Sequence, residues 1–358
     1  MSDQDIIQAL ERRCGSLQTR CRYTNGRLTE LDLAHFWLKD LPPELGELTS
    51  LEHIHLKDND LAHFPAEFWN LRNLKNLDLQ VNRLETLPPE LGKLTSLEQL
   101  DLAYNELTHF PAEFWNLRNL KGLYLPNNRF ETLPPEISRL INLETLLLDD
   151  NPLISLPAEV GHLRHLQGLG IWDCQLTALP REIGLLSRLE HLTLAGNHLH
   201  TLPPEIRRLG RLKSLNIAFN QFEALPSEIG RLVQLHSLDV TNNSLTDFPA
   251  DIAQLHHLQL LNLSENRLTT LPPEISRLRN VQLLELSENQ LEVLPSELGT
   301  LSHLEQLVVS GNPLVSFPPE ICHLSALQMI GLDRRQFTLL SEEMLQFFTS
   351  QNVSLQVV

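Results

Sequence analysis

Aromatic residues and cysteines are both scarce in this chain of 358 residues. Phe, Trp and Tyr make up 6% of the sequence although 42% of it is hydrophobic, so any core must rest mainly on aliphatic side chains. The cysteines are too few for a disulfide framework in so long a chain, which favours a reducing compartment. They are Cys14, Cys21, Cys174 and Cys322, of which Cys14 and Cys21 are close enough in sequence to pair if oxidised.

Long hydrophobic runs are missing as well. No stretch of about 18 apolar residues is present that could span a bilayer. The first ten residues, MSDQDIIQAL, lack the basic region and the apolar region of a secretory signal. We therefore expect a cytoplasmic protein that does not associate with a membrane.

The motifs of several common enzyme classes are also absent. The sequence has no phosphate-binding Gly-rich loop with Gly-Lys-Ser/Thr, no Gly-x-Ser-x-Gly elbow, no His-Glu-x-x-His and no Cys-x-x-Cys. We therefore expect that the chain is not an enzyme and that it uses no cofactor and no metal.

What the sequence does contain is leucine at a fixed interval. A unit of 23 residues recurs without insertion and follows the pattern L-x-x-L-x-L-x-x-N-x-L-x-x-L-P-x-E-L/I-x-x-L-x-x. Self-similarity at a fixed period of roughly 20–50 residues indicates a solenoid or a related repeat architecture. The units begin at Leu28, Leu51, Leu74, Leu97, Leu120, Leu143, Leu166, Leu189, Leu212, Leu235, Leu258, Val281, Leu304 and Leu327.

Each column of the unit has a physical role. Leucines at the fourth and sixth positions, such as Leu77 and Leu79, alternate along a short strand and point into a core shared with the neighbouring units. The ninth position is usually asparagine, whose amide can donate to and accept from the backbone of adjacent turns. Leu-Pro-x-Glu then places proline at the start of a short helical turn and an acid near the positive end of its dipole.

The acid of that last motif explains most of the net charge. The column runs from Glu44 to Glu320, with Asp251 as its one aspartate, and supplies thirteen of the 45 acidic residues, against 28 basic residues and a net charge of −17. The gross charge therefore reflects the start of each helical turn and says little about a ligand.

Units of the Leu-Pro-x-Glu-Ile/Leu type resemble the 23-residue class of leucine-rich repeats of bacterial proteins, animal Ras-pathway scaffolds and plant intracellular relatives. The resemblance covers about residues 28 to 340. It implies an α/β fold, namely a right-handed curved solenoid with a parallel concave sheet of about 14 strands and short helical turns on the convex side. It also implies a non-catalytic protein-interaction scaffold.

The ends of the chain depart from the repeat, as the caps of a solenoid do. We expect an N-terminal cap at residues 1–27 with an amphipathic helix that contains Ile6, Ile7 and Leu10. The repeats then occupy residues 28–340, and residues 341–358 form a C-terminal cap helix and tail. Phe36 and Arg335 replace the asparagine of the ninth position in the first and last units.

The exposed strand positions are the most informative about function, because the core does not fix them. The third, fifth, seventh and eighth residues of the units include thirteen acids but only two bases, Lys57 and Arg334. An acidic concave sheet repels the phosphates of nucleic acids and favours a protein partner with a basic surface. We expect a monomer that binds such a partner.

One part of this face is aromatic. Between the units that begin at Leu97 and Leu166, large apolar side chains flanked by carboxylates replace the acids and small polar residues. Rigid aromatic anchors surrounded by charge are typical of binding hot spots, although mutual packing of the same side chains is the alternative. The predicted partner-binding residues are Tyr104, Tyr124, Leu147, Asp149, Asp150, Trp172, Asp173 and, as an outlying contact, Phe219.

Three further features each have two interpretations. His53 and His55 alternate on one predicted strand near carboxylates, which suits a metal, but a polar strand explains them as well. Trp69 and Trp115 lie in a segment that occurs twice, FPAEFWNLRNLK, and form either an exposed convex patch or merely a copied sequence. Cys174, in the asparagine column, is interpreted as a buried structural thiol rather than a redox sensor.

Two other functions are compatible with the same residues. One is an effector-like protein, exported without a cleaved signal, that acts on a host protein. The other is a binder of glycans or small molecules that uses the concave aromatic residues beside carboxylates. A stoichiometric protein partner in a pull-down would favour the scaffold or the effector over the third reading.

Overall fold

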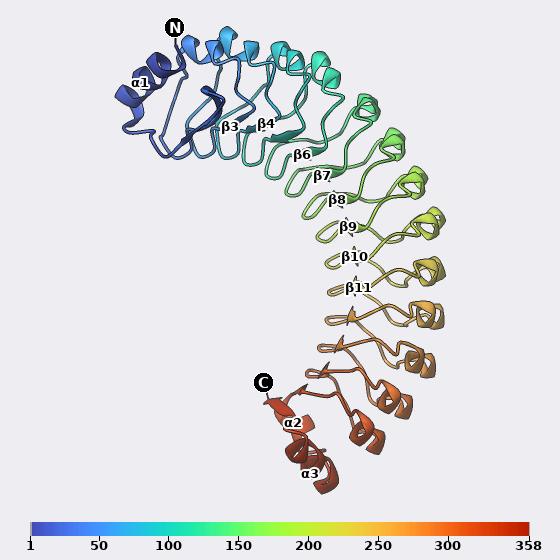
Figure 1. Ribbon diagram of the computed structural model, residues 1–358. Helices are drawn as coiled ribbons and strands as arrows, with labels where there is room; N and C mark the ends of the chain where they lie inside the picture. Colours follow the sequence, from blue (N-terminus) through green and yellow to red (C-terminus); the bar gives the residue numbers. More distant parts are fainter. Residues whose placement is uncertain (1, 358) are drawn as a thin grey trace. The chain divides into compact units, whose positions relative to one another are not determined.

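The computed structural model describes residues 2–357, which form two compact units. Unit 1 ends at Cys174 and unit 2 begins at Gln175. In each unit short strands follow one side of the chain path and single-turn 3₁₀ helices follow the other, as Figure 1 shows. We call these two sides the strand face and the helix face of the unit.

Unit 1 contains one α-helix, six 3₁₀ helices and eight strands among its described residues. The helices are α1 (Asp3–Cys14), η1 (Pro43–Glu47), η2 (Ala66–Asn70), η3 (Pro89–Lys93), η4 (Ala112–Asn116), η5 (Pro135–Arg139) and η6 (Ala158–His162). The strands are β1 (Cys21–Thr24), β2 (Arg27–Asp32), β3 (His53–His55), β4 (Asn76–Asp78), β5 (Gln99–Asp101), β6 (Gly122–Tyr124), β7 (Thr145–Leu147) and β8 (Gly168–Gly170).

Unit 2 repeats this arrangement and adds two α-helices near its end. The helices are η7 (Arg181–Leu185), η8 (Pro204–Arg208), η9 (Ser227–Arg231), η10 (Ala250–Gln254), η11 (Pro273–Arg277), η12 (Ser296–Thr300), η13 (Pro319–His323), α2 (Arg334–Phe337) and α3 (Glu342–Ser350). The strands are β9 (His191–Thr193), β10 (Ser214–Asn216), β11 (Ser237–Asp239), β12 (Leu260–Asn262), β13 (Leu283–Glu285), β14 (Gln306–Val308), β15 (Met329–Leu332) and β16 (Ser354–Val357).

The repeat strands within a unit pair in parallel, and each step is one repeat of the sequence. Leu77 in the middle of β4 pairs with Ile54 of β3 and with Leu100 of β5, and all three side chains are buried. Each repeat thus adds one layer of aliphatic side chains to a common core. The strands β2–β8 and β9–β15 are the predicted repeat strands, so the repeat architecture is confirmed.

The asparagine ladder supplies the hydrogen bonds that the short strands cannot. The Nδ2 group of Asn82 donates to the carbonyls of Leu56 at 3.0 Å and Leu79 at 3.1 Å, and its Oδ1 accepts from the N–H of Leu61 at 3.1 Å. In the last repeat Gln336, rather than Arg335 at the ninth position, continues the ladder: its buried amide donates to the carbonyls of Val309 and Asn312. No buried side-chain nitrogen or oxygen within residues 2–357 lacks a partner.

The helix face alternates between close and wide spacing in the first four turns. A Cβ atom at Gly46 would overlap the backbone carbonyl of Glu67, so η1 and η2 can approach closely only with glycine there. In the next repeat Trp69 holds the same position and packs edge-on against Phe68, at 5.1 Å between ring centroids. Trp69 and Trp115 are only 1% and 3% exposed, so of the two interpretations the exposed convex patch is excluded: these rings are part of the core beneath the helix face.

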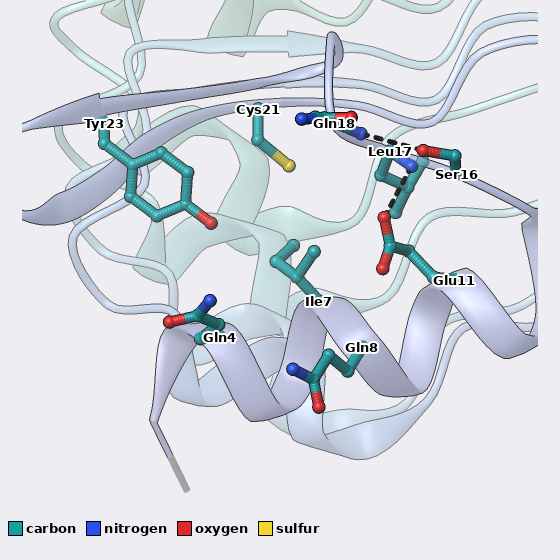
Figure 2. Close-up of a pocket in the computed structure, with 9 residues that line it drawn as sticks. All are labelled: Gln4, Ile7, Gln8, Glu11, Ser16, Leu17, Gln18, Cys21 and Tyr23. Atoms are coloured by element: carbon teal, nitrogen blue, oxygen red, sulfur yellow. Dashed lines mark hydrogen bonds between the residues drawn. The ribbon is translucent and has the colours of Figure 1, made fainter.

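The segments before and after the repeats are ordered as well. Helix α1 begins at a capping box between Ser2 and Asp5 and buries Ile6, Ile7 and Leu10. Strand β1 pairs antiparallel with β2, and a cavity of about 440 Å³ lies between β1 and α1, into which Figure 2 shows Cys21 and Tyr23 pointing. At the other end α3 buries Met344 and Phe348, and β16 pairs with β15. The division into two caps and one solenoid stays a prediction.

Candidate partner-binding surface

Many acids of the strand face have a structural role that the sequence did not reveal. At the fifth position of their repeats, Asp32, Asp78 and Asp101 each accept a hydrogen bond from the backbone N–H two residues later, at 2.8, 3.0 and 2.9 Å. Asp239 and Glu285 of unit 2 do the same. This side-chain turn satisfies an N–H group at the end of the strand. These acids therefore cannot be counted simply as groups free for a ligand.

The pattern is interrupted in three successive repeats of unit 1, where the fifth position holds Tyr124, Leu147 and Gly170. None of these side chains can accept the turn hydrogen bond. The seventh position compensates in the first two of these repeats. Pro126 has no N–H to satisfy, and Asp149 brings a carboxylate of its own.

The third repeat is compensated by its neighbour. The N–H of Trp172 donates to Oδ1 of Asp149 at 2.7 Å, which replaces the acceptor that Gly170 lacks. The turn acceptor of the fifth position can thus be missing from three adjacent strands, because a proline or the carboxylate of Asp149 replaces its role. This arrangement permits a continuous apolar surface on a face that is otherwise polar.

The interrupted segment is closely packed along the strands. Tyr124 pairs with Leu147, and Leu147 pairs with Gly170, so the register places these residues side by side as predicted. A Cβ atom at Gly170 would lie 2.8 Å from Cδ2 of Leu147 and 3.0 Å from Oδ1 of Asp149, so both side chains lie over the glycine. The hydroxyl of Tyr124 donates to Oε1 of Gln99 at 3.1 Å, and this pair lies over Gly122 in the same way.

Two large rings next to this segment remain exposed. Tyr104 is 51% exposed and Trp172 is 47% exposed, while Tyr124 and Leu147 are half-buried. None of the contacts between aromatic rings within residues 2–357 involves Tyr104, Tyr124 or Trp172. Ring-to-ring packing is therefore not what keeps these side chains in place. We call Tyr104, Tyr124, Leu147 and Trp172 the aromatic patch.

Two carboxylates beside the aromatic patch, those of Asp149 and Asp150, have raised pKa values. Burial raises the pKa of Asp149 above its ordinary 3.8, and its hydrogen bond from Trp172 opposes that rise. Burial also raises the pKa of Asp150, and the neighbouring Asp173 raises it further by charge repulsion. Asp150 accepts one hydrogen bond, from Asn127 at 3.2 Å. A cation placed against Asp150 and Asp173 would relieve this repulsion.

The structure therefore brings most of the predicted site residues together. Tyr124, Leu147, Asp149, Asp150, Trp172 and Asp173 lie on three adjacent repeats of unit 1, and Tyr104 joins them because its N–H donates to the carbonyl of Pro126 at 2.8 Å. Phe219 lies in unit 2, where it is 52% exposed on the strand face. It is not part of the group in unit 1.

The alternative sites are weaker in the structure. His55 contacts Asp78 at 3.7 Å and Glu30 at 3.9 Å, and the interaction with Asp78 raises the pKa of the imidazole. Across residues 2–357, no three His, Cys, Asp or Glu side chains converge in a way that could hold a metal ion. Cys174 is buried, as predicted, and burial raises its pKa to about 11, which makes it a poor nucleophile.

The terminal cavity is polar and partly open. Glu11 accepts a hydrogen bond from the N–H of Leu17 at 2.9 Å across its floor, as Figure 2 shows. Cys14 and Cys21 are both free thiols, and burial raises the pKa of each. Within residues 2–357, no helix is both long enough and apolar enough to cross a membrane.

Comparison with known families identifies the repeats. Models described as leucine-rich repeats match residues 26–84, 72–130 and 233–291, a leucine-rich repeat region matches 158–244, and a further single repeat matches 303–324. A solved leucine-rich-repeat protein of Leptospira interrogans is 35% identical, over 92% of this chain and 91% of that chain, with a TM-score of 0.84. The chain belongs to the leucine-rich repeat family.

Two other solved structures show how widely the fold is shared. An internalin of Listeria monocytogenes is 21% identical, over 91% of this chain and 93% of its own, with a TM-score of 0.75. The plant peptide hormone receptor RGFR1, solved in complex with RGF2, is 25% identical, over 88% of this chain and 68% of its own, with a TM-score of 0.60. A search of curated proteins finds no match. Leucine-rich repeats commonly serve as protein-interaction scaffolds, and no catalytic family is among the matches.

Proposed function

We propose that this chain is a non-catalytic scaffold whose protein partner docks on the strand face of unit 1, over the aromatic patch. The observation that carries the proposal is that the turn hydrogen bond normally accepted by the fifth residue of the repeat is missing in this segment. Three adjacent repeats abandon the turn acceptor, and Pro126 and Asp149 compensate for its loss. The result is an apolar surface beside two exposed rings, which is what a binding hot spot requires.

The partner has a basic surface at the point of contact. Asp150 and Asp173 lie beside the aromatic patch, and the repulsion between them raises the pKa of Asp150. A Lys or Arg side chain of the partner would offset this repulsion and would lie near the ring of Trp172. The acids at the fifth position contribute to the field, but their oxygens are already engaged by the backbone.

The relatives support a protein or peptide ligand. The plant receptor was solved with a peptide hormone, and it shares the repeat fold over most of this chain. We further propose that the chain acts in the cytoplasm as a monomer, which its four free thiols support. An exported effector would present the same surface to a host protein.

The test is affinity capture from native lysate with the full chain as bait. We expect a stoichiometric protein with a basic surface that dissociates as salt is raised, because exposed charges are screened beyond about 10 Å at 0.1 M. The variant with Asp150→Asn and Asp173→Asn should capture less of this protein and depend less on salt. Asparagine tolerates the left-handed backbone at both positions, so these changes alter charge with little strain.

The matched control is Glu131→Lys, an exposed acid of unit 1 outside the strand face. It should capture as much protein as the wild-type bait. Capture that is insensitive to salt and to both aspartates would contradict the charge-led contact. Capture of a glycan or small molecule, without a protein, would instead favour a ligand binder.

A further inference from the structure

A second surface, on the helix face of unit 2, has the opposite chemistry. A cavity of about 320 Å³ is lined by His256, Arg277, Arg279 and Asn280. Two arginines, a histidine and an amide thus surround one cavity, and no carboxylate is part of its lining. All four side chains are exposed.

The two guanidinium groups are not neutralised by the protein itself. The ion pairs within residues 2–357 involve neither Arg277 nor Arg279. Asp251 of η10, the nearest turn before the cavity, is hydrogen-bonded by the amide of Gln254 at 3.2 Å. Two cations that line one cavity repel each other, and an anion placed between them removes that cost.

The backbone around the cavity is fixed on both sides. Asn280 donates through Nδ2 to the carbonyl of His256 at 2.6 Å, which ties the turn after η11 to the turn after η10. The ring of His303, one repeat further, contacts the carbonyl of Arg279 at 2.9 Å. The arginines therefore project from turns that are held by both neighbouring repeats, and the site needs little rearrangement to bind a ligand.

We propose that this cavity binds a phosphomonoester. Each guanidinium group presents planar N–H donors that can bind two phosphate oxygens at once. Two guanidinium groups together can therefore bind more oxygens than a carboxylate has, which favours a phosphate as the ligand. The cavity is near the lower limit of ligand pockets, roughly 300–1,000 Å³, and suits a phosphate with a small organic group. The phosphate comes either from a free metabolite or from a phosphorylated side chain of a protein. The site is independent of the strand face of unit 1.

The chain contains its own matched control. Helices η5 and η11 have the same sequence, Pro-Glu-Ile-Ser-Arg, and in both the serine hydroxyl donates to the first proline carbonyl at 2.8 Å. After η5, however, Ile141 replaces the second arginine of the site. Arg139 is therefore an arginine in an equivalent turn that lacks the second arginine two residues later, and Arg118 holds the place of His256 there.

The experiment is calorimetric titration of the full chain with inorganic phosphate, phosphoserine, a phosphoserine peptide and acetate at low salt. We expect saturable binding of phosphoserine, weakened about tenfold by Arg277→Gln or Arg279→Gln and unchanged by Arg139→Gln. Acetate should bind much more weakly. Tighter binding of the peptide than of phosphoserine supports a phosphorylated partner, and equal binding supports a free metabolite.

Three results would overturn the proposal. They are the absence of saturable heat with every phosphate compound, equal affinity for acetate, and an equal loss of binding in the Arg139→Gln variant. Circular dichroism of each variant verifies that the fold is intact, and because the substituted side chains are exposed we expect no change.

Discussion

At the scale of single residues, the eighth position of the repeat carries an unusual backbone. Its φ angle is positive in thirteen repeats, from His35 to Gly311. Asn, Asp and Gly adopt this region readily, whereas Val, Tyr and Phe do so only under strain. Val81, Tyr104 and Phe219 nevertheless occupy it, with φ angles of 54°, 56° and 53°. Tyr104 is also half exposed, so burial of its ring offsets little of the backbone strain.

Replacing Tyr104 with asparagine should therefore stabilise the protein while it weakens partner binding. We expect Tyr104→Asn to raise the free energy of unfolding by about 1 kcal/mol, since a bulky residue in this region costs roughly 1–3 kcal/mol and asparagine adopts it more readily. Urea denaturation measures the change. Tyr124→Asn, in an ordinary strand conformation, relieves no such strain and should bring no gain in stability. A loss of stability in Tyr104→Asn would mean that the ring is held by packing and not for binding.

The raised pKa of Asp149 has a consequence for stability against pH. Because its folded-state pKa is above the ordinary 3.8, the folded protein gains stability as pH falls toward 3.8 and loses it as pH rises through the folded pKa. Asp149→Asn keeps the oxygen that accepts from Trp172 and removes the charge. This variant should be more stable than the wild type at pH 7, and the difference should shrink toward pH 4. A difference that does not change with pH would contradict this account.

At the scale of the elements, the spacing of the 3₁₀ helices depends on one residue of each repeat. It is the second residue after the acid of the Leu-Pro-x-Glu motif. Glycine at this point allows the next helix to approach, as Gly92 of η3 does beneath Glu113. Tryptophan fills a wider gap, as Trp69 of η2 does between η2 and η3. The helix face is therefore packed by complementary sizes in neighbouring repeats and not by the consensus alone.

Gly92→Ala tests this packing directly. The added Cβ would overlap the carbonyl of Glu113, and backbone atoms must move to make room, so we expect a loss of about 1–3 kcal/mol in the free energy of unfolding. Gly210, also on the helix face, has no atom within 4 Å of an added Cβ. Gly210→Ala should leave the stability nearly unchanged. Equal effects of the two substitutions would show that the contact with Glu113 is not what requires glycine.

The sequence alone predicts the repeat strands, the asparagine ladder and the register of the patch, because one fixed period determines which side chains lie in one column. Tyr124 and Leu147 could be placed side by side for this reason. The sequence alone does not reveal which groups form hydrogen bonds with each other. The turn hydrogen bond that the N–H of Ala103 donates to Asp101 depends on the local backbone, and so does the bond that Trp172 of the next repeat donates to Asp149. The burial of Trp69 depends on helix spacing, which the period leaves free.

At the scale of the whole molecule, the two proposed sites belong to different units and have opposite charges. In unit 1 the carboxylates of Asp150 and Asp173 lie on the strand face, whereas in unit 2 Arg277 and Arg279 surround a cavity on the helix face. A solenoid separates two such surfaces easily, because every repeat contributes residues to both faces.

The central claim is that the aromatic patch of unit 1 is the binding site for the protein partner. It is tested most directly by the affinity of the captured partner for the double variant Trp172→Ala and Tyr124→Ala, with Ile141→Ala on the helix face as control. We expect a dissociation constant at least about 30-fold higher for the double variant, equivalent to about 2 kcal/mol, with an almost unchanged melting temperature and no effect of the control. Wild-type affinity in the double variant, or a loss of affinity that merely follows unfolding, would contradict the claim.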